Sequence, residues 1–116
     1  MRKMKIFPIE MPIYVNTFVH VFIGTKEQLE FHFKRMWPKS TIFDEDGDYG
    51  SFTAKDKDGN PCMFMVNGFS LNTAVHEAIH AASKVMENLG WKHDYRNEEP
   101  YAYMVAFIVS ELNRLK

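Results

Sequence analysis

Cysteine is almost absent from this chain. Its 116 residues contain one cysteine, Cys62, so no disulfide bond can form within the chain. Small secreted domains are often stabilised by several disulfides, whereas thiols stay reduced in the cytoplasm. The segment that begins at Cys62 and ends at Val66 is wholly apolar. We therefore expect a buried, unreactive thiol and a cytoplasmic location.

Long hydrophobic segments are absent as well. The basic start of the chain, Met1 to Lys5, is followed by an interrupted apolar stretch that is too short for the core of a signal peptide. The longest apolar run near the other end, Tyr103 to Val109, is far below the roughly 18 residues that span a bilayer. We expect no association with a membrane.

The chain also lacks an excess of charge of either sign. Its formal net charge is −1, and acidic and basic residues are mixed along it. Proteins that bind nucleic acids usually carry a strongly basic surface, so we expect no nucleic-acid partner. With 46% hydrophobic residues and no internal repeat or linker, residues 1–116 are expected to form one domain with a single core. We expect no second domain that could enclose a deep cleft.

The distribution of apolar residues predicts three helices. Thr25 to Gln28 matches a capping box, and Pro38 ends the apolar pattern that follows it. Leu71 to Leu89 contains neither Pro nor Gly and is followed by Gly90, a residue that favours helix ends. A third helix is expected from Asn97 to Leu115. In the second helix, one apolar row should pack against a sheet, and its members are Val75, Ile79, Ala82, Met86 and Leu89.

Short strands are predicted between the turn signals. They are rich in β-branched and aromatic residues, and they span Ile13 to Ile23, Thr41 to Phe43, Tyr49 to Lys55 and Cys62 to Val66. Asp46-Gly47 and Asp58-Gly59 are typical of turns between them. The apolar strand that starts at Cys62 should be covered on both faces. The fold class is therefore α+β: a strand, a helix, a small antiparallel sheet, and two C-terminal helices.

The most informative motif lies in the second predicted helix. It reads His76-Glu77-Ala78-Ile79-His80, with two imidazoles four residues apart and a glutamate beside the first. Positions i and i+4 of a helix lie on the same face, so both rings can reach one metal ion. This spacing is typical of hydrolytic zinc sites. The competing interpretation is an exposed helix face that carries these residues by chance.

A hydrolytic zinc ion usually has three protein ligands and keeps its fourth position for water. The metzincin pattern would place Gly and His where Ser83 and Met86 stand, which excludes that family. Residues 93–95 (His, Asp, Tyr) match no zincin spacing that we can identify. The remaining candidates are Glu98 and Glu99 at the start of the third helix. Acidic residues also suit the positive end of a helix dipole, so this pair has an ordinary structural explanation too.

The His76-Glu77-x-x-His80 motif, followed by Glu99-Pro100-Tyr101-Ala102, resembles the gluzincin type of zincin-like metallopeptidase. The resemblance extends to the small zincin-like proteins encoded by phages and mobile elements. It covers roughly the C-terminal 45 residues, so the N-terminal part is matched only by its expected architecture. The resemblance implies a zincin-like fold in which the first turn of the last helix faces the two histidines.

The same resemblance implies a role for each residue of the motif. His76, His80 and Glu99 would be zinc ligands, and Glu77 would be the general base. Glu98 is the alternative third ligand, because neighbouring helical residues point about 100° apart and only one of the two can face the metal. Tyr103, Tyr101, Tyr95 and His93 are near enough in sequence to be considered as oxyanion stabilisers, although packing between the two helices is the more common explanation for the tyrosines.

The leading hypothesis is therefore a zinc-dependent metallopeptidase that hydrolyses a peptide or amide bond of a peptide or protein substrate. An alternative hypothesis is a catalytically weak or inactive zinc-binding interaction module of phage or mobile-element origin. A third is a metal-free phage accessory protein. Glu77 distinguishes the first two, because a purely structural zinc site has no use for a general base. Oligomeric state is not predicted by the sequence.

Overall fold

The computed structural model describes residues 3–12, 17–39, 50–92 and 94–116. The predicted strand from Thr41 to Phe43 and the predicted turn at Asp46-Gly47 lie outside these residues. The described elements, in chain order, are β1 (Lys5–Glu10), β2 (Phe18–Gly24), α1 (Lys26–Met36), β3 (Phe52–Lys55), β4 (Pro61–Val66), α2 (Leu71–Asn88), the short 3-10 helix η1 (Tyr95–Asn97) and α3 (Glu98–Leu115).

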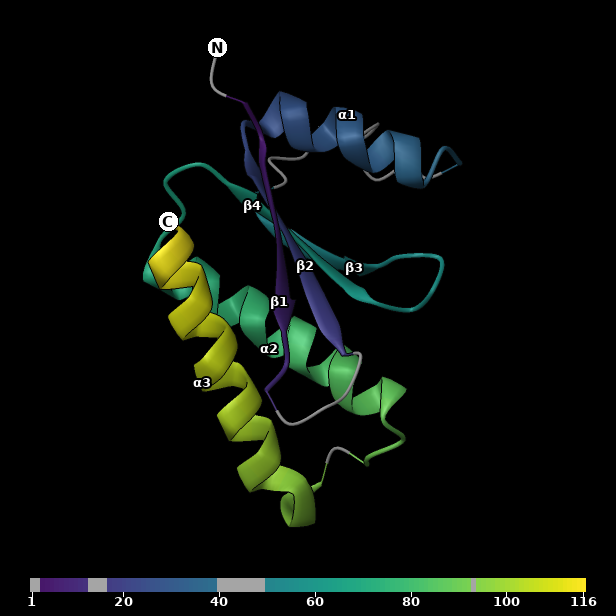
Figure 1. The fold of residues 1–116 in the computed structure, drawn as a ribbon, viewed down its shortest axis with the longest axis vertical. Helices are drawn as coiled ribbons and strands as arrows, with labels where there is room; N and C mark the ends of the chain where they lie inside the picture. Colours follow the sequence, from purple (N-terminus) through teal and green to yellow (C-terminus); the bar gives the residue numbers. More distant parts are fainter. Residues whose placement is uncertain (1–2, 13–16, 40–49, 93) are drawn as a thin grey trace.

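The four described strands form one sheet in the order β1-β2-β4-β3 (Figure 1). The two outer pairs are antiparallel, but β2 and β4 run parallel, with His20 opposite Cys62. The predicted α+β class is confirmed, and β3 and β4 are antiparallel as predicted, but the sheet as a whole is mixed because the N-terminal strand β2 joins it parallel to β4. The chain leaves β2 through α1, enters the sheet again in β3 in the opposite direction, and reverses before β4, which therefore runs parallel to β2.

Strand β1 was not predicted from the sequence, because Pro8 interrupts it. Proline cannot donate a hydrogen bond, and it is tolerated in a sheet only at an edge or a bulge. The structure places β1 at the edge of the described sheet, where Pro8 lies opposite His20. Its side chains are mostly exposed, so it also lacks the apolar alternation by which strands are recognised.

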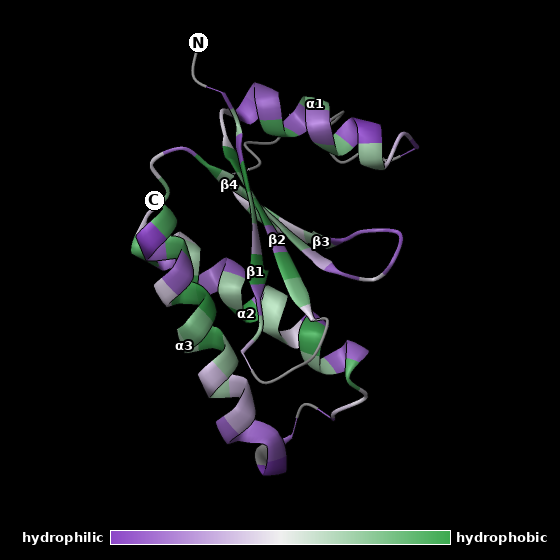
Figure 2. Ribbon diagram, in the orientation of Figure 1, coloured by the Kyte–Doolittle hydropathy of each residue, from purple (hydrophilic) through white to green (hydrophobic). Residues whose placement is uncertain are grey.

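Helices cover both faces of the sheet (Figure 1). Side chains of β2 alternate between them: Val21 lies in the core under α2 and α3, and Phe22 lies under α1. In β4, Met63 and Phe64 divide in the same way, so burial of this strand on both faces is confirmed. Hydrophobic colour in Figure 2 follows β2 and the middle of α3, while the beginning of α3 is hydrophilic.

Local signals correctly predicted the ends of two helices. Thr25 Oγ1 accepts a hydrogen bond from the Gln28 backbone N–H at 3.1 Å, and Gln28 Oε1 accepts one from the Thr25 N–H at 2.9 Å. At the end of α2, Gly90 takes a positive φ of 76°. The Trp91 N–H then donates to the Met86 carbonyl, as in a Schellman motif. Among the described residues, no helix combines the length and apolar character needed to cross a membrane.

The buried face of α2 differs from the predicted one. Val75 and Ile79, expected against the sheet, are 36% and 41% exposed. Ala82 and Met86 are buried as predicted. The other buried residues of the helix were not in the predicted row and are mostly small: Ala74, Glu77, Ala78, Ala81 and Val85. The sheet presents bulky side chains such as Met63 and Met65 to this core, so the helix approaches it through its alanines. The prediction is wrong at Val75 and Ile79 because it gave more weight to large apolar residues than to small ones.

Candidate metal centre

The two histidines of the motif lie on the exposed side of α2. Their Nε2 atoms are 3.3 Å apart, and the ring planes are inclined by 71°. Two nitrogens at this separation, each about 2.05 Å from one metal ion, would subtend an angle of about 107° at it, which is close to tetrahedral. The separation of the two nitrogens is therefore compatible with two ligand positions of one zinc ion.

Glu77 lies between this pair and the edge strand β3. Its side chain is buried, and Oε1 accepts a hydrogen bond of 2.8 Å from Thr53 Oγ1, which also lies 3.3 Å from the Glu77 carbonyl oxygen. The second carboxylate oxygen, Oε2, lies 3.9 Å from His76 Nε2. One oxygen is thus held by the sheet, and the other faces the nitrogen that would bind a metal.

Thr53 is the residue of this site that sequence reasoning missed. The alternation in β3 could have indicated its direction, because Phe52 and Ala54 pack under α1 and Thr53 must face the opposite side. No pattern in the sequence, however, relates a threonine in β3 to a glutamate in α2. Their contact depends on how the helix crosses the sheet.

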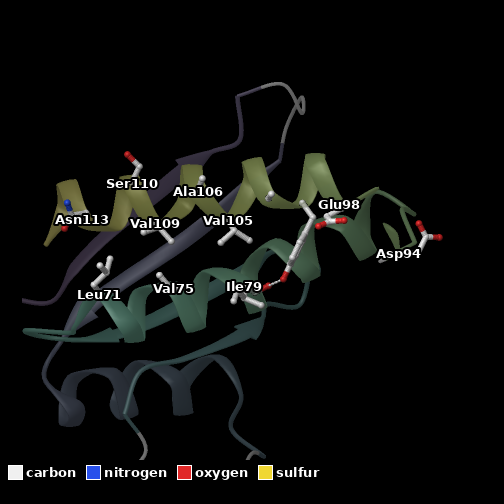
Figure 3. A pocket seen from close by; sticks show the side chains of 12 residues that line it. Leu71, Val75, Ile79, Asp94, Glu98, Val105, Ala106, Val109, Ser110 and Asn113 are labelled. Carbon is white, nitrogen blue, oxygen red and sulfur yellow. Dashed lines mark hydrogen bonds between the residues drawn. The ribbon is translucent and has the colours of Figure 1, made fainter. Parts of the chain in front are cut away.

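The two candidates for the third ligand lie in different surroundings. Glu98 lines a groove between α2 and α3, together with Ile79 and Tyr101 (Figure 3). Glu99, the predicted ligand, lines a separate cavity beside Trp91. Both glutamates are exposed.

The predicted three-ligand arrangement is not assembled in this structure. In the described part of the chain, no group of three or more His, Cys, Asp or Glu side chains is close enough together to hold a metal ion. The structure brings His76, Glu77 and His80 together, but it does not bring Glu99 to them. Glu99 as third ligand stays a prediction.

The aromatic candidates for oxyanion stabilisation also lie in two places, the groove that contains Glu98 and the cavity that contains Glu99. The Tyr101 hydroxyl lies 3.5 Å from the Ile79 carbonyl oxygen and 3.5 Å from Ser83 Oγ, so this ring spans the helix pair next to His80. Tyr103 is 72% exposed and lines the cavity that contains Glu99. His93 and the side chain of Tyr95 lie outside the described residues.

Glu87, a further carboxylate on α2, already forms an ion pair with Lys55. Lys55 Nζ donates to its Oε1 at 2.7 Å and also contacts Asn88 Oδ1 at 3.3 Å. The hydrogen bond and charge of Lys55 lower the pKa of Glu87 below its usual value. These contacts join the end of β3 to the last turns of α2, so two points along the helix, Glu77 and Glu87, are held by one edge strand.

The buried thiol predicted from the sequence is confirmed. Cys62 lies in β4 and is 1% exposed. Burial raises its pKa to about 12, so the reactive thiolate form is suppressed near neutral pH. Cys62 is therefore neither a nucleophile nor a metal ligand in this arrangement.

Comparison of the chain with protein-family models, with curated proteins and with solved structures gives no match. The chemistry of the site is therefore argued from its own residues. Those residues are two converging imidazoles and a glutamate that is fixed through one oxygen.

Proposed function

We propose that the chain binds a zinc ion through His76 and His80 and hydrolyses a peptide or amide bond, as a zincin-like metallopeptidase of the gluzincin type. One observation carries this proposal: the two Nε2 atoms converge at 3.3 Å on an exposed surface, beside a carboxylate whose position is fixed. Both imidazoles are exposed, and their contacts are with each other and with Glu77.

Glu77 is proposed as the general base. A bound zinc ion would lower the pKa of a coordinated water to about 7 and polarise the carbonyl of the substrate. Glu77 Oε2 faces His76, so it can accept the proton of such a water and later deliver it to the leaving amine. Thr53 keeps the other oxygen in place, which limits the motion of the base during this transfer.

For the third ligand, the groove favours Glu98 over Glu99. Glu98 lines the same groove as Ile79 and Tyr101, both of which border the helix turn that carries His80. The cavity of Glu99 contains no residue of α2. We therefore propose that Glu98 completes the coordination when zinc is present, through a change of its side-chain rotamer.

An inactive zinc-binding interaction module is the second candidate. It is favoured by the open position of the histidines, since the His76 side chain is 69% exposed. A metal held there by two ligands could take its remaining ligands from another protein. Glu77 opposes this alternative, because a carboxylate with a free oxygen beside a ligand suits catalysis better than a closed structural site.

Metal analysis of the purified protein tests the zinc site. The wild type should hold about one zinc per chain after dialysis, and His76→Ala or His80→Ala should hold none. His20→Ala, which alters a histidine of strand β2, is the matched control and should retain the metal. Zinc content that is the same in the wild type and in both α2 variants would exclude this site.

Two further comparisons separate the roles. Glu98→Gln should lose zinc and Glu99→Gln should keep it; the opposite result would return the ligand role to Glu99. Glu77→Gln should keep zinc, because it leaves both imidazoles unchanged, and should abolish cleavage of a peptide library. A wild type that binds zinc but cleaves no peptide would support the interaction module instead.

A further inference from the structure

A cavity of about 520 Å³ lies where three parts of the chain meet. These parts are the residues that lead into β1, the loop between β4 and α2, and the end of α3; the loop and the end of α3 lie side by side in Figure 1. Residues of the His76 motif do not line this cavity, and neither Glu98 nor Glu99 does, so it is separate from the proposed zinc site. Three of the residues that do line it are lysines: Lys3, Lys5 and Lys116.

These three lysines lack acidic partners. No Asp or Glu of the described chain lines the cavity, and none of the three ammonium groups forms an ion pair with a described carboxylate. Four other basic side chains, by contrast, are paired at 2.6–3.1 Å: Lys34 with Glu30, Lys55 with Glu87, Arg96 with Asp94, and Arg114 with Glu111. Because like charges that share a cavity repel one another, a bound anion would stabilise this arrangement.

The alternation of β1 directs Lys5 towards the cavity. Phe7 and Ile9 pack in the core under α2 and α3, and Lys5 lies on the same face of the strand, two positions before Phe7. Opposite Lys5 in the sheet is Ile23, which is 5% exposed and also lines the cavity. The row of core side chains therefore ends in a charge at the point where the cavity begins.

The ammonium group of Lys116 reaches the cavity from the end of α3. Its Nζ lies 5.4 Å from the ring centre of Phe69, within the range of a cation–π contact. Lys116 also follows the negative end of α3, which is an ordinary reason for a cation at that position. This reason does not extend to Lys3 and Lys5, which come from the opposite end of the described chain. The helix end therefore accounts for only one of the three charges.

The rest of the lining suits a bound anion. Phe69 and Leu115 contribute apolar surface, and charges of one sign beside low-dielectric walls attract counter-ions more strongly than the same charges on an open surface. Asn67 contributes an exposed side-chain amide, which is a neutral hydrogen-bond donor. At Gly68 an added Cβ would meet no atom within 4 Å, so a ligand can approach the backbone there.

We propose that this cavity binds the phosphate monoester group of a small organic molecule. Near neutral pH such a group carries a charge of about −1.5 to −2 and three strong acceptor oxygens. The cavity volume of about 520 Å³ lies within the range of small-molecule sites. The proposal uses no residue of the zinc site, so it stands or falls independently of it.

The types of residue in the lining favour phosphate over other anions. Lysines act on phosphate oxygens as separate point charges, whereas a planar carboxylate is better matched by the fork of an arginine. No arginine of the described chain lines the cavity. A nucleic-acid strand fits less well, because Phe69, the aromatic residue of the lining, is only 6% exposed and offers little ring surface for stacking.

Titration with methyl phosphate, followed by NMR, tests the site. The backbone amide signals of Asn67, Gly68 and Phe69 should shift and saturate, with EDTA present as well as without it. Dimethyl phosphate should bind more weakly, because it carries a single negative charge. The absence of a saturable shift at these amides would overturn the proposal. Equal affinity for the two probes would overturn it as well, since the cavity would then not select the more highly charged group.

Removal of single charges tests the three lysines. Lys3→Gln, Lys5→Gln and Lys116→Gln should each weaken the binding of methyl phosphate by about threefold to fivefold, in keeping with exposed ion pairs, and the triple variant should show no measurable binding. All three side chains are exposed, so circular dichroism should show an unchanged fold. Lys57→Gln is the matched control, because it removes the same charge from the exposed turn between β3 and β4. If this control lost as much affinity as the other variants, binding would reflect overall charge and the proposal would be wrong.

Vesicles distinguish two sources of the phosphate group. Phosphatidic acid carries a phosphate monoester on a lipid, so vesicles of phosphatidylcholine that contain it can be compared with vesicles of phosphatidylcholine alone. We expect the protein to stay in solution with both, because the three lysines line a cavity. Sedimentation of the wild type, but not of the triple variant, with the phosphatidic acid vesicles would assign the group to a lipid and overturn the small soluble ligand.

Discussion

The two sides of α2 differ in whether packing constrains their residues. The side against the sheet consists mainly of alanines that are 0–3% exposed, and each is constrained by the bulky side chains opposite it. The outer side carries two exposed histidines and a row of exposed large apolar residues. Within the described residues, neither group belongs to the buried core. The comparison shows where to look for function: at residues whose presence packing does not explain.

The largest expected change in the free energy of unfolding comes from a substitution on the side of α2 that packs against the sheet. Ala78→Leu adds three carbons at a position with no exposed surface, so it should lower the free energy of unfolding by about 2–3 kcal/mol through overpacking. Ile79→Leu, on the outer side of the same turn, should change it by less than about 0.5 kcal/mol. Urea unfolding measures both. Equal effects would mean that the two sides are not packed differently.

A substitution at the boundary between the two sides of α2 should have an intermediate effect on the free energy of unfolding. Thr53→Val keeps the shape of the side chain but leaves the buried Glu77 oxygen without its donor, which should cost about 1–2 kcal/mol in unfolding free energy. Thr53→Ser retains the hydroxyl and serves as the control. If Thr53→Val were as stable as the wild type, the carboxylate would have another source of stabilisation. Glu77 would then not be held by β3 in the way described.

On the outer side, the histidines should matter little to the metal-free fold. His76→Ala and His80→Ala should each change the free energy of unfolding by less than about 0.5 kcal/mol in EDTA. With zinc at a hundred times its dissociation constant, the wild type should gain about 2.7 kcal/mol and the variants nothing. Thermal unfolding with and without zinc separates the two effects. A large loss in EDTA would show that the imidazoles serve the fold.

The smallest expected effect concerns the ion pair between Lys55 and Glu87. Because the pKa of Glu87 is lowered in the folded chain, its contribution to stability is present above the unfolded pKa and is lost as the pH falls through the folded one. Titration followed by NMR should place the Glu87 carboxyl below the value of 4.5 found for a free side chain. Lys55→Met should raise the Glu87 pKa towards that value, while Lys84 still lowers it slightly. An unchanged titration in the variant would remove Lys55 as the cause.

The sequence predicted those parts of the fold that depend on near neighbours. The capping box of α1, the end of α2 at Gly90 and the convergence of His76 and His80 each involve residues at most four or five positions apart. Spacing along a helix is enough to place them. The α+β class followed from the same local patterns.

Features that depend on tertiary packing were not predictable. The parallel pairing of β2 with β4, the rotation of α2 onto its alanines and the contact of Thr53 with Glu77 all require the relative placement of distant elements. The choice of the third ligand also depends on the relative placement of distant elements. Glu98 and Glu99 are neighbours in sequence, and only the packing of α3 decides which of them shares a groove with α2.

The parallel pair at the centre of the sheet has a consequence for how the chain folds. β1 and β2 can pair as soon as they are synthesised, and α2 and α3 can associate as consecutive helices. The pairing of His20 with Cys62, by contrast, must wait until α1 and β3 have emerged, and it requires closure of a long loop. We expect this closure to limit the folding rate. Val21 and Met63 are completely buried in the folded chain. Until this closure occurs, they remain exposed to solvent and can promote aggregation.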